Sequence, residues 1–361
     1  MTVHRTDTPA LRMPDGWEPP VPSFTSRFAD GSKSIVAAYL AAQGRSRSEA
    51  LAGAAPIVGF LERGAGPYRV DRAVHRAGSG TWDAVAIAYF KGTEDFEAWA
   101  NGSGFSQWWA SDDRLHERVG YWQERLVLPQ ERIEALHSSP VADGHSHGGR
   151  IVGPIREHAY WGGMRDRLPV SRHDWLDSPK GDVLEARADV VSSGRRIGVK
   201  APANLAIIRS GQDLSAAAPD ERAMYDEVVR GNLVAGMAFL AERGVEAGCC
   251  ACRYMTEVDA NGHDLERTFG HCLFLSLAHL EDWAKSHPTH LSIYASFFKL
   301  LKQRDNQMTL RFWHEVAVIP EDGQFFEYLN CSPDTGLIGF FDADQASLQG
   351  RKAMSIIGMV K

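Results

Sequence analysis

An internal duplication constrains the fold of this chain more than any other feature of its sequence. Residues 90–100 (FKGTEDFEAWA) match residues 274–284 (FLSLAHLEDWA) without a gap, at an offset of 184. Residues 121–129 (YWQERLVLP) match residues 312–320 (FWHEVAVIP), at an offset of 191. The first pair predicts a strand end that leads into a helix, and the second predicts a strand closed by proline.

Two weaker matches extend the duplication. Residues 60–64 resemble 239–244, and the apolar run at 35–40 resembles 205–208, in the same order in both halves. Each half is then predicted to contain strand, helix, strand, strand, helix and strand. We therefore expect an α+β fold of two fused ferredoxin-like units, of the dimeric α+β barrel type, with antiparallel sheets flanked by helices. The halves are residues 34–137 and 201–336.

Three segments lie outside the halves. Residues 1–33 contain four prolines within nine positions and are expected to form an extended arm on the surface. Residues 138–200 begin as a linker and continue as an ordered excursion that carries Arg167, and residues 337–361 form a C-terminal tail. His145 and His147 lie in the glycine-rich part of the linker, where we expect a solvated loop and no metal site.

Composition excludes several classes of function. The formal net charge is -7 and no Lys/Arg-rich stripe is present, so a nucleic-acid partner is not expected. Neither a secretory leader nor about 18 uninterrupted apolar residues occurs, which predicts a cytoplasmic protein with no membrane partner. Five cysteines do not have the spacing of a zinc site and are interpreted as structural or incidental thiols: Cys249, Cys250, Cys252, Cys272 and Cys331.

A duplicated fold with one functional site should differ between its halves at the positions that carry chemistry. At the first offset His290 pairs with Ser106, and at the second His314 pairs with Gln123. Aligning the glycines that follow the first strands pairs Ser210 with Gln43. The second half has therefore gained two histidines and a serine, and these become the candidate site residues.

His290 is predicted to lie one turn into a helix that runs from about His287 to Lys302, with Ser286 as its N-cap. Five residues then share one helical face: His290, Ile293, Tyr294, Phe297 and Leu301. An imidazole on an aromatic and aliphatic stripe suits a haem with one axial ligand, although a core histidine explains the same pattern. Because no CxxCH run is present, any haem is bound non-covalently.

The other two candidates are placed on strands. His314 lies mid-strand, where alternation directs it to the same side as Phe312 and Val316, and a histidine there needs a hydrogen bond or a function. Ser210 follows an apolar strand and precedes Gly211, a location where side chains often meet ligands. A satisfied core histidine remains open as the explanation of His314.

At these residues the sequence resembles the aldoxime dehydratases, haem b enzymes that convert an aldoxime, R-CH=N-OH, into a nitrile and water. The resemblance extends from about residue 71 to 333. Five separated blocks carry it: residues 107–115, 157–165, 209–213, 286–290 and 314–316. It implies an aldoxime substrate, a haem b cofactor that is active with ferrous iron, and a homodimer.

The resemblance also implies a role for individual residues. His290 matches the proximal ligand of the haem iron, at the end of the run HPTH, whereas His287 in the same run is not a ligand. His314 matches the distal acid/base histidine and Ser210 the serine that binds the oxime hydroxyl. Arg167 matches the arginine of the MRxR segment, and Glu134 a glutamate linked to the distal histidine.

In the implied mechanism, ferrous haem binds the oxime nitrogen, Ser210 and Arg167 polarise the oxime oxygen, and protonated His314 donates to it so that water leaves. The ferric form should then be inactive. Two alternatives stay open: a haem peroxidase with a related fold, for which Arg167 is equally suitable, and a non-enzymatic haem carrier or sensor, which needs His290 but no polar distal residues. The choice between aliphatic and aryl aldoximes depends on pocket shape, which the sequence does not show.

Overall fold

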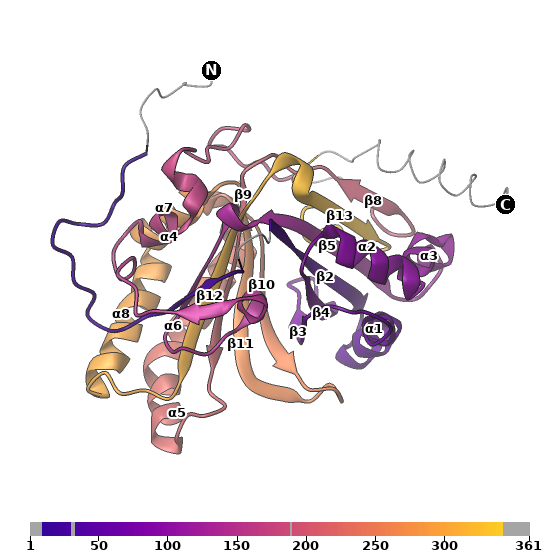
Figure 1. Cartoon of the computed structure of the whole chain (residues 1–361). Helices are drawn as coiled ribbons and strands as arrows, with labels where there is room; N and C mark the ends of the chain where they lie inside the picture. The colour runs from indigo at the N-terminus through magenta and orange to yellow at the C-terminus, as the bar shows by residue number, and fades with distance from the viewer. Residues whose placement is uncertain (1–8, 30–32, 188–189, 342–361) are drawn as a thin grey trace. The chain divides into compact units, whose positions relative to one another are not determined.

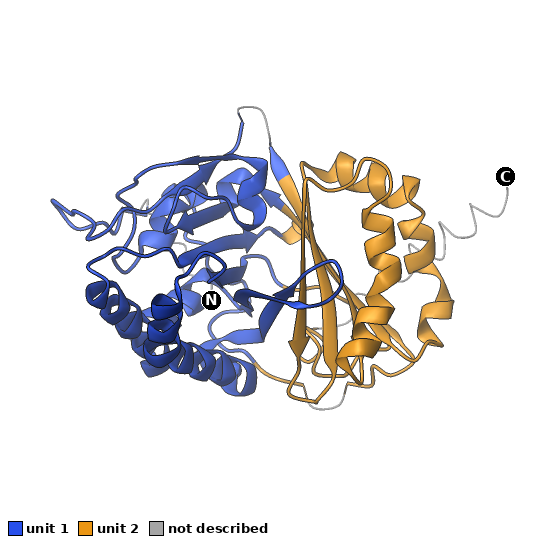
Figure 2. Ribbon diagram, turned by 90° about the horizontal axis from the view of Figure 1, so that it is seen from below, with its two compact units in different colours: residues 1–34, 128–184, 202–320 blue, residues 35–127, 185–201, 321–361 orange. Residues whose placement is uncertain are grey.

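The structure is a computed structural model that describes residues 9–29, 33–187 and 190–341. The chain forms two compact units, each assembled from separated segments (Figure 2). Unit 1 comprises residues 1–34, 128–184 and 202–320, and unit 2 comprises residues 35–127, 185–201 and 321–361. Each unit has its own strands and helices, and each is described by itself below.

Unit 2 begins with six elements in the order strand, helix, strand, strand, helix, strand. These are β2 (Ser34–Gly44), α1 (Arg47–Leu61), β3 (Arg69–Arg76), β4 (Trp82–Phe90), α2 (Thr93–Gly102) and β5 (Gly120–Pro129), with a short α3 (Phe105–Ala110) before the last strand. Two later strands, β8 (Arg196–Val199) and β13 (Gln324–Leu329), complete a sheet of order β3-β4-β2-β5-β13-β8. The pairings β3–β4, β2–β4, β13–β5 and β13–β8 are antiparallel.

Unit 1 repeats this order of elements in its second half. The elements are β9 (Leu205–Asp213), α5 (Pro219–Tyr225) continued by α6 (Gly231–Arg243), β10 (Cys249–Val258), β11 (Asp264–Phe274), α7 (Leu277–Ser286) followed by α8 (Pro288–Gln303), and β12 (Arg311–Ile319). With β6 (Ile133–His137) they form a sheet of order β6-β12-β9-β11-β10. The pairings of β12 with β6 and β9, and of β11 with β9 and β10, are antiparallel.

The fold is therefore mixed α and β, with antiparallel sheets and flanking helices as predicted, and the predicted order of elements is confirmed in both halves (Figure 1). The matched runs also have matching structures: β4 and β11 each end just before a helix, and proline closes or follows β5 and β12. Two strands pair outside the half in which the sequence placed them. Strand β6, from residues 34–137, pairs with β12, and β13, from residues 201–336, pairs with β5.

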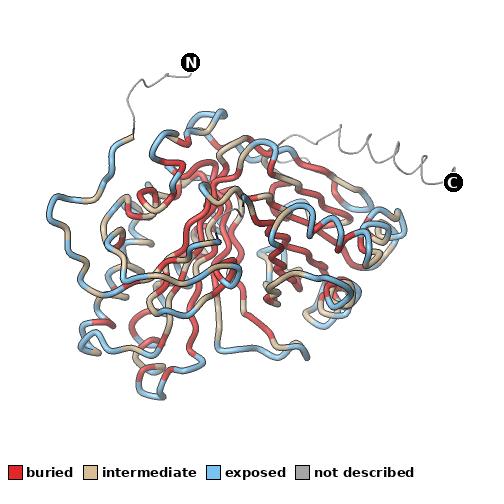
Figure 3. Tube along the Cα trace, viewed as in Figure 1, coloured by how far each residue is buried: buried red, intermediate tan, exposed pale blue. Residues whose placement is uncertain are grey.

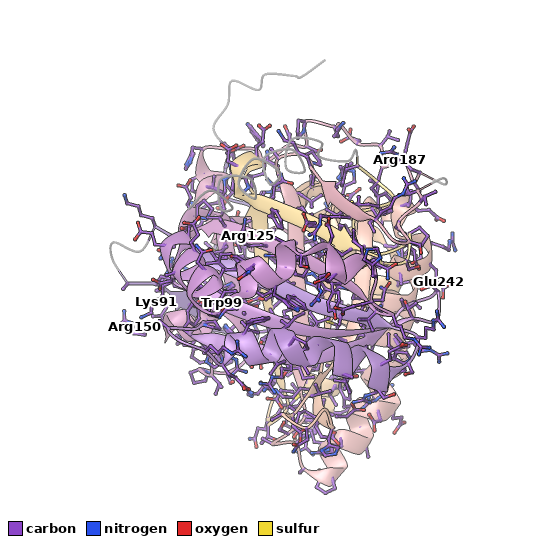
Figure 4. All side chains as sticks on the ribbon, turned by 90° about the vertical axis from the view of Figure 1, so that its right-hand side faces the viewer. Lys91, Trp99, Arg125, Arg150, Arg187 and Glu242 are labelled. Atoms are coloured by element: carbon purple, nitrogen blue, oxygen red, sulfur yellow. The ribbon has the colours of Figure 1, made fainter. Side chains whose placement is uncertain are left out.

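The strands are buried over most of their length, as Figure 3 shows, and most of their buried side chains are apolar. Every residue of β2 after its first is buried. In unit 2 the indole of Trp99, labelled in Figure 4, lies 5.1 Å from the ring of Phe90, and its Nε1 donates to the carbonyl of Phe60 at 2.9 Å. This contact packs α2 onto its sheet.

The N-terminal arm and residues 138–184 of the linker and excursion belong to unit 1 and contain short elements, whereas residues 185–200 belong to unit 2. Strand β1 (Thr25–Arg27) pairs with β7 (Arg150–Val152), and α4 (Gly163–Arg167) lies in the excursion. The expectation that the arm only lies on the surface is therefore wrong, since Ser23 and Thr25 are buried. Most of the predicted tail, from residue 342 onward, falls outside the described residues.

Two local expectations need correction. The N-cap of α8 is His287 and not Ser286, because the His287 imidazole accepts from the backbone N–H of Thr289. His145 is not in a solvated loop: it is buried, and its backbone N–H donates to Glu315 at 2.8 Å. His147 is exposed, as expected.

The remaining expectations concern cysteines and membranes. All five cysteines lie among the described residues, are buried and form no disulfide with one another, as expected for incidental thiols. Within the part of the chain that the structure describes, no cluster of three or more metal-binding side chains occurs. No helix there is long and apolar enough to cross a bilayer.

The backbone beside Ser210 depends on a glycine, and this can be tested. A Cβ at Gly211 would collide with the indole of Trp313. We expect Gly211→Ala to lower Tm by about 3–10 °C, because overpacking costs roughly 1–3 kcal/mol. In the control, Gly231→Ala, no atom lies within 4 Å of the added Cβ, so Tm should stay constant or rise. Equal melting temperatures for the two variants would contradict this packing.

Candidate active site

One face of α8 lines a cavity of about 360 Å³ in unit 1, which we call the α8 cavity. All five residues of the predicted stripe line it: His290, Ile293, Tyr294, Phe297 and Leu301. The predicted face is therefore confirmed. The rest of the wall comes from β6, β9 and β12, from the α5–α6 region, and from the N-terminal arm. A concave, largely apolar space of this size is typical of a ligand site.

His290 is held on this wall by aromatic rings. Its imidazole lies 4.7 Å from the ring of Trp283 and 6.3 Å from that of Trp161, both edge to face. Burial lowers the pKa of His290 to about 4, and the backbone of Ala284 offsets this only in part. Its buried Nδ1 makes no hydrogen bond to any described residue. His290 is thus a neutral imidazole at pH 7, which is the form that binds a metal.

The sheet supplies the polar groups of the α8 cavity. In the pairing of β9 with β12, Ser210 lies directly opposite His314, so both side chains leave the same face of the sheet. Leu136 of β6 lies opposite His314 on its other side. Ser210, His314 and Leu136 all line the cavity. Two candidates that are 104 positions apart in the sequence therefore meet in one cross-strand row.

Behind His314 lies a buried ion cluster of three residues. Arg167 donates through Nε and Nη2 to the two carboxylate oxygens of Glu134, at 2.6 and 3.1 Å. His314 Nε2 lies 3.0 Å from Glu134 Oε1 and 2.9 Å from Arg167 Nη2. The side chains of Glu134 and Arg167 are only 1% and 6% exposed, whereas that of His314 is 24% exposed.

The hydrogen bonds of His314 Nε2 depend on its protonation. An Nε2 that carries hydrogen can donate to Glu134 but cannot accept from Arg167, and an unprotonated Nε2 can accept from Arg167 but cannot donate to Glu134. Both states of the ring therefore have a partner at the same place. This arrangement suits a side chain that changes protonation during a reaction.

Glu134 remains charged in spite of its burial. Burial alone would raise its pKa, but the charges of Arg167 and His314 and their hydrogen bonds outweigh this and lower the pKa of Glu134 to about 2. Its carboxylate is therefore an acceptor for an Nε2–H of His314 at any pH above that value. The cluster can thus supply a proton donor at the wall of an apolar cavity.

Arg167 and Glu134 face a second cavity, of about 490 Å³, which we call the rear cavity. It is lined by both side chains, by buried His145 and Asp166, and by exposed groups such as Arg27. Arg167 does not line the α8 cavity, because its N–H groups point to Glu134, His314 and the carbonyl of Glu157. This placement differs from the expectation that Arg167 polarises the oxime oxygen directly.

The structure brings His290, His314 and Ser210 together on one cavity, and Glu134 and Arg167 directly behind His314. Sequence reasoning missed Trp283 and Trp161 beside His290, and Val21, Pro22 and Ser23 of the arm on the cavity wall. The run of prolines indicated an extended segment, but no local pattern indicated which surface it covers.

Comparison with known proteins agrees with this geometry. The model of the haem-containing dehydratases matches residues 38–337. The chain belongs to this family. It is 34% identical over 340 residues to the aliphatic aldoxime dehydratase of Rhodococcus erythropolis, which spans 91% of this chain and 93% of that protein. It is 32% identical over 338 residues to the phenylacetaldoxime dehydratase of Bacillus sp. strain OxB-1, covering 92% and 95%.

Solved structures give the same result. A crystal structure of an aldoxime dehydratase in complex with butyraldoxime has a TM-score of 0.84 and 33% identity, covering 91% of this chain and 92% of that chain. A second aldoxime dehydratase structure has the same TM-score and identity. The resemblance inferred from the sequence is therefore confirmed.

The residues present fit the haem that the family name implies. A buried, neutral imidazole projects from an aromatic helix face into a cavity, and its Nδ1 makes no hydrogen bond to a described residue, so the ring has a nitrogen that could bind iron. His287, three residues before His290, is occupied differently: it caps α8 and stacks on Phe239 at 4.0 Å. His290 is thus the histidine of this run that is available to iron.

The ion cluster predicts how stability depends on pH in Arg167→Met. Wild-type Glu134 contributes stability that is full above its ordinary pKa of 4.5 and is lost as pH falls to about 2. Without Arg167 the burial of Glu134 dominates and its pKa rises, so the variant loses stability as pH increases. We expect the Tm of Arg167→Met to lie below that of wild type at pH 7, and this difference to become smaller toward pH 4. Circular dichroism measures both melting temperatures.

A matched control lies on the same helix. Arg165→Met breaks the pair of Arg165 with Glu281, whose side chain is 13% exposed, and leaves Glu134 and Arg167 intact. Its Tm deficit should change much less with pH than that of Arg167→Met. A deficit of Arg167→Met that is constant between pH 4 and 7 would show that Glu134 is not held ionised by Arg167.

Proposed function

We propose that this protein dehydrates aldoximes to nitriles and water in the α8 cavity, with a haem bound at His290. The observation that carries the proposal is the cross-strand pair of Ser210 and His314 on the cavity wall opposite the α8 face, backed by Glu134 and Arg167. The relatives named as aldoxime dehydratases, at 32–34% identity over more than nine-tenths of the chain, support the same reaction.

The difficult step in this reaction is the departure of hydroxide from nitrogen, which needs a proton donor at the oxygen. When bound, haem b in its ferrous state supplies an iron that binds the oxime nitrogen and weakens the N–O bond. The protein supplies the rest: the Ser210 hydroxyl orients the oxime oxygen by a hydrogen bond, and the apolar stripe of α8 excludes water around the R group.

We infer that His314 donates the proton. Its Nε2 faces Glu134 and Arg167, so Nδ1 is the nitrogen left for the oxime. In the imidazolium form, Nε2–H donates to Glu134 while Nδ1–H donates to the leaving oxygen. The ring that results keeps one proton and an unprotonated Nδ1, which can accept the C–H proton of the substrate. Protons balance over one turnover, because one leaves carbon and one reaches oxygen.

Glu134 and Arg167 act through His314 and are positioning residues in this proposal. Glu134 stabilises the charged ring, and Arg167 keeps Glu134 ionised while its N–H offers the neutral ring a donor. Arg167 is therefore proposed to tune the acid, in place of a direct contact with the oxime oxygen.

Three further features of the proposal rest on the resemblance and on the strand orders. The order of strands in each unit supports ferredoxin-like units of the dimeric α+β barrel type. We further propose a homodimer, which the resemblance implies, and a cytoplasmic location. Size-exclusion chromatography with light scattering measures the first of these two.

A haem peroxidase is the second candidate function. Peroxide cleavage uses a distal histidine and arginine that both reach the ligand, but here Arg167 lies behind His314. A haem carrier or sensor needs His290 and the apolar stripe, yet gives no reason for the buried cluster at His314. A dehydratase accounts both for His290 with the apolar stripe and for the buried cluster at His314.

Turnover in defined redox states tests the proposed function. We expect the haem-loaded protein, reduced with dithionite under nitrogen, to convert an aldoxime to its nitrile, and the ferric protein to be inactive. Nitrile is measured by gas chromatography. The control is oxidation of a phenolic dye by peroxide, which should remain at the level of free haem. Dye oxidation without nitrile formation would overturn the proposal in favour of the peroxidase.

Two histidine variants separate cofactor binding from proton transfer. His314→Ala should retain haem and lose at least about a hundredfold in kcat, because it removes the general acid. His290→Ala should lose haem first, so its Soret band falls when haem is titrated into the apoprotein, and activity is lost as a consequence. Near wild-type turnover by haem-loaded His314→Ala would show that another group donates the proton.

A further inference from the structure

Part of the wall of the α8 cavity comes from residues 12–28, which we call the N-terminal strap. Val21, Pro22 and Ser23 line the cavity. Along these three residues exposure changes: Ser23 is buried, Val21 is partly buried and Pro22 is exposed. A residue that contacts solvent on one side and the cavity on the other forms its mouth. Val21 and Pro22 therefore form part of the rim of the α8 cavity.

The strap is held in place by contacts with the excursion and with β6. Among the described residues before β1, the strap has no helix or strand, only an isolated bridge between Phe24 and His137. The backbone N–H of Ile155 donates to the Ser23 carbonyl at 2.9 Å, which fixes the inner end of the rim. Trp17 Nε1 donates to the carbonyl of His158 at 3.0 Å. These bonds, together with the two backbone hydrogen bonds between Phe24 and His137, help to fix the position of the rim.

The outer end of the strap is fastened by one buried carboxylate. Asp166, 5% exposed, accepts from the backbone N–H of Arg12 at 2.9 Å, from that of Met13 at 3.0 Å and from the hydroxyl of Tyr160 at 2.8 Å. A buried carboxylate is retained only where donors satisfy it, and all three of these donors belong to the strap or the excursion. We call this arrangement the Asp166 clasp.

The clasp is adjacent to the ion cluster. Asp166 and Arg167 are consecutive in α4, and they point to different partners: Asp166 to the strap and Arg167 to Glu134 and His314. The same short helix therefore positions both the rim of the cavity and the group that tunes its acid. The strap also lines the rear cavity, through Thr25, Ser26, Arg27 and Phe28.

We propose that the N-terminal strap is the wall that selects aldoximes by the size of the R group, with Val21 and Pro22 as the specificity-determining residues and Asp166 as the residue that positions them. The proposal rests on the proposed function for the identity of the substrate. Its physical basis is shape: a β-branched side chain and a proline are stiff, so a rim built from them yields little to a bulky R group.

Changing the rim tests selection directly. The readout is the ratio of kcat/KM for phenylacetaldoxime to that for acetaldoxime, under the ferrous conditions above. We expect Val21→Ala to raise this ratio about tenfold and Val21→Phe to lower it, since a one- or two-carbon change in a binding pocket typically alters kcat/KM by that order. Val141→Ala is the matched control, because Val141 is 46% exposed and lines neither cavity. Ratios within twofold of wild type in both Val21 variants would overturn the assignment of the rim.

Loosening the clasp tests positioning. Deleting residues 1–13 removes the Arg12 and Met13 amides, and Asp166→Asn removes the carboxylate charge, whereas deleting residues 1–8 leaves every clasp bond in place. We expect the first two variants to raise KM for acetaldoxime about tenfold with kcat within threefold, and the third to match wild type. A fall in kcat with unchanged KM would show that Asp166 acts on the ion cluster and not on the rim.

A binding measurement keeps this test independent of the proposed reaction. Imidazole association with the ferric haem protein, followed by stopped-flow absorbance, should be several-fold faster in the 1–13 deletion and in Asp166→Asn than in wild type or the 1–8 deletion. If wild type turns over no aldoxime, the proposed function fails and these rates still decide whether the strap restricts entry. Equal rates in all four proteins would overturn the strap as a wall.

Discussion

The arrangement of the site depends on a single constraint: a carboxylate, Glu134, is buried and charged. It remains so only because Arg167 meets both of its oxygens and His314 approaches one of them. These residues come from β6, from the excursion and from β12, which are distant in sequence. Removing one partner of a buried pair typically costs about 3–5 kcal/mol, so the cluster fastens the excursion to the sheet at a defined place.

The cluster also separates two environments. Glu134 and Arg167 line the rear cavity, and His314 lines the α8 cavity. Of these three residues only His314 lines the α8 cavity. A positive charge on its imidazole, unlike that of Arg167, can be lost by releasing a proton. A charged group in an apolar space is costly unless it is paired. The imidazole of His314 is paired with Glu134 and is charged only when it is protonated.

Much of this could be predicted from the sequence, for identifiable reasons. The duplication fixed the order of elements, and helical periodicity placed His290 and Phe297 on one face, because both are local patterns. The meeting of Ser210 and His314 depends on strand register, which was accessible only through the matched halves. The strap and the placement of Arg167 were not accessible, since they arise from hydrogen bonds between segments with no repeating pattern.

The duplicated unit shows why the matched positions of unit 2 do not form a wall like that of the α8 cavity. The counterpart of His290 is Ser106, an exposed residue on α3, which has six residues, whereas α8 has sixteen. The counterpart of Ser210 is Gln43, which is buried and donates to Asp83 at 3.0 Å. In unit 2 the matched positions are therefore solvated or satisfied internally. In unit 1 the longer helix α8 supplies the apolar face. Ser210 stands where unit 2 has Gln43, whose amide is hydrogen-bonded within the protein, and the smaller serine hydroxyl can instead bond a ligand.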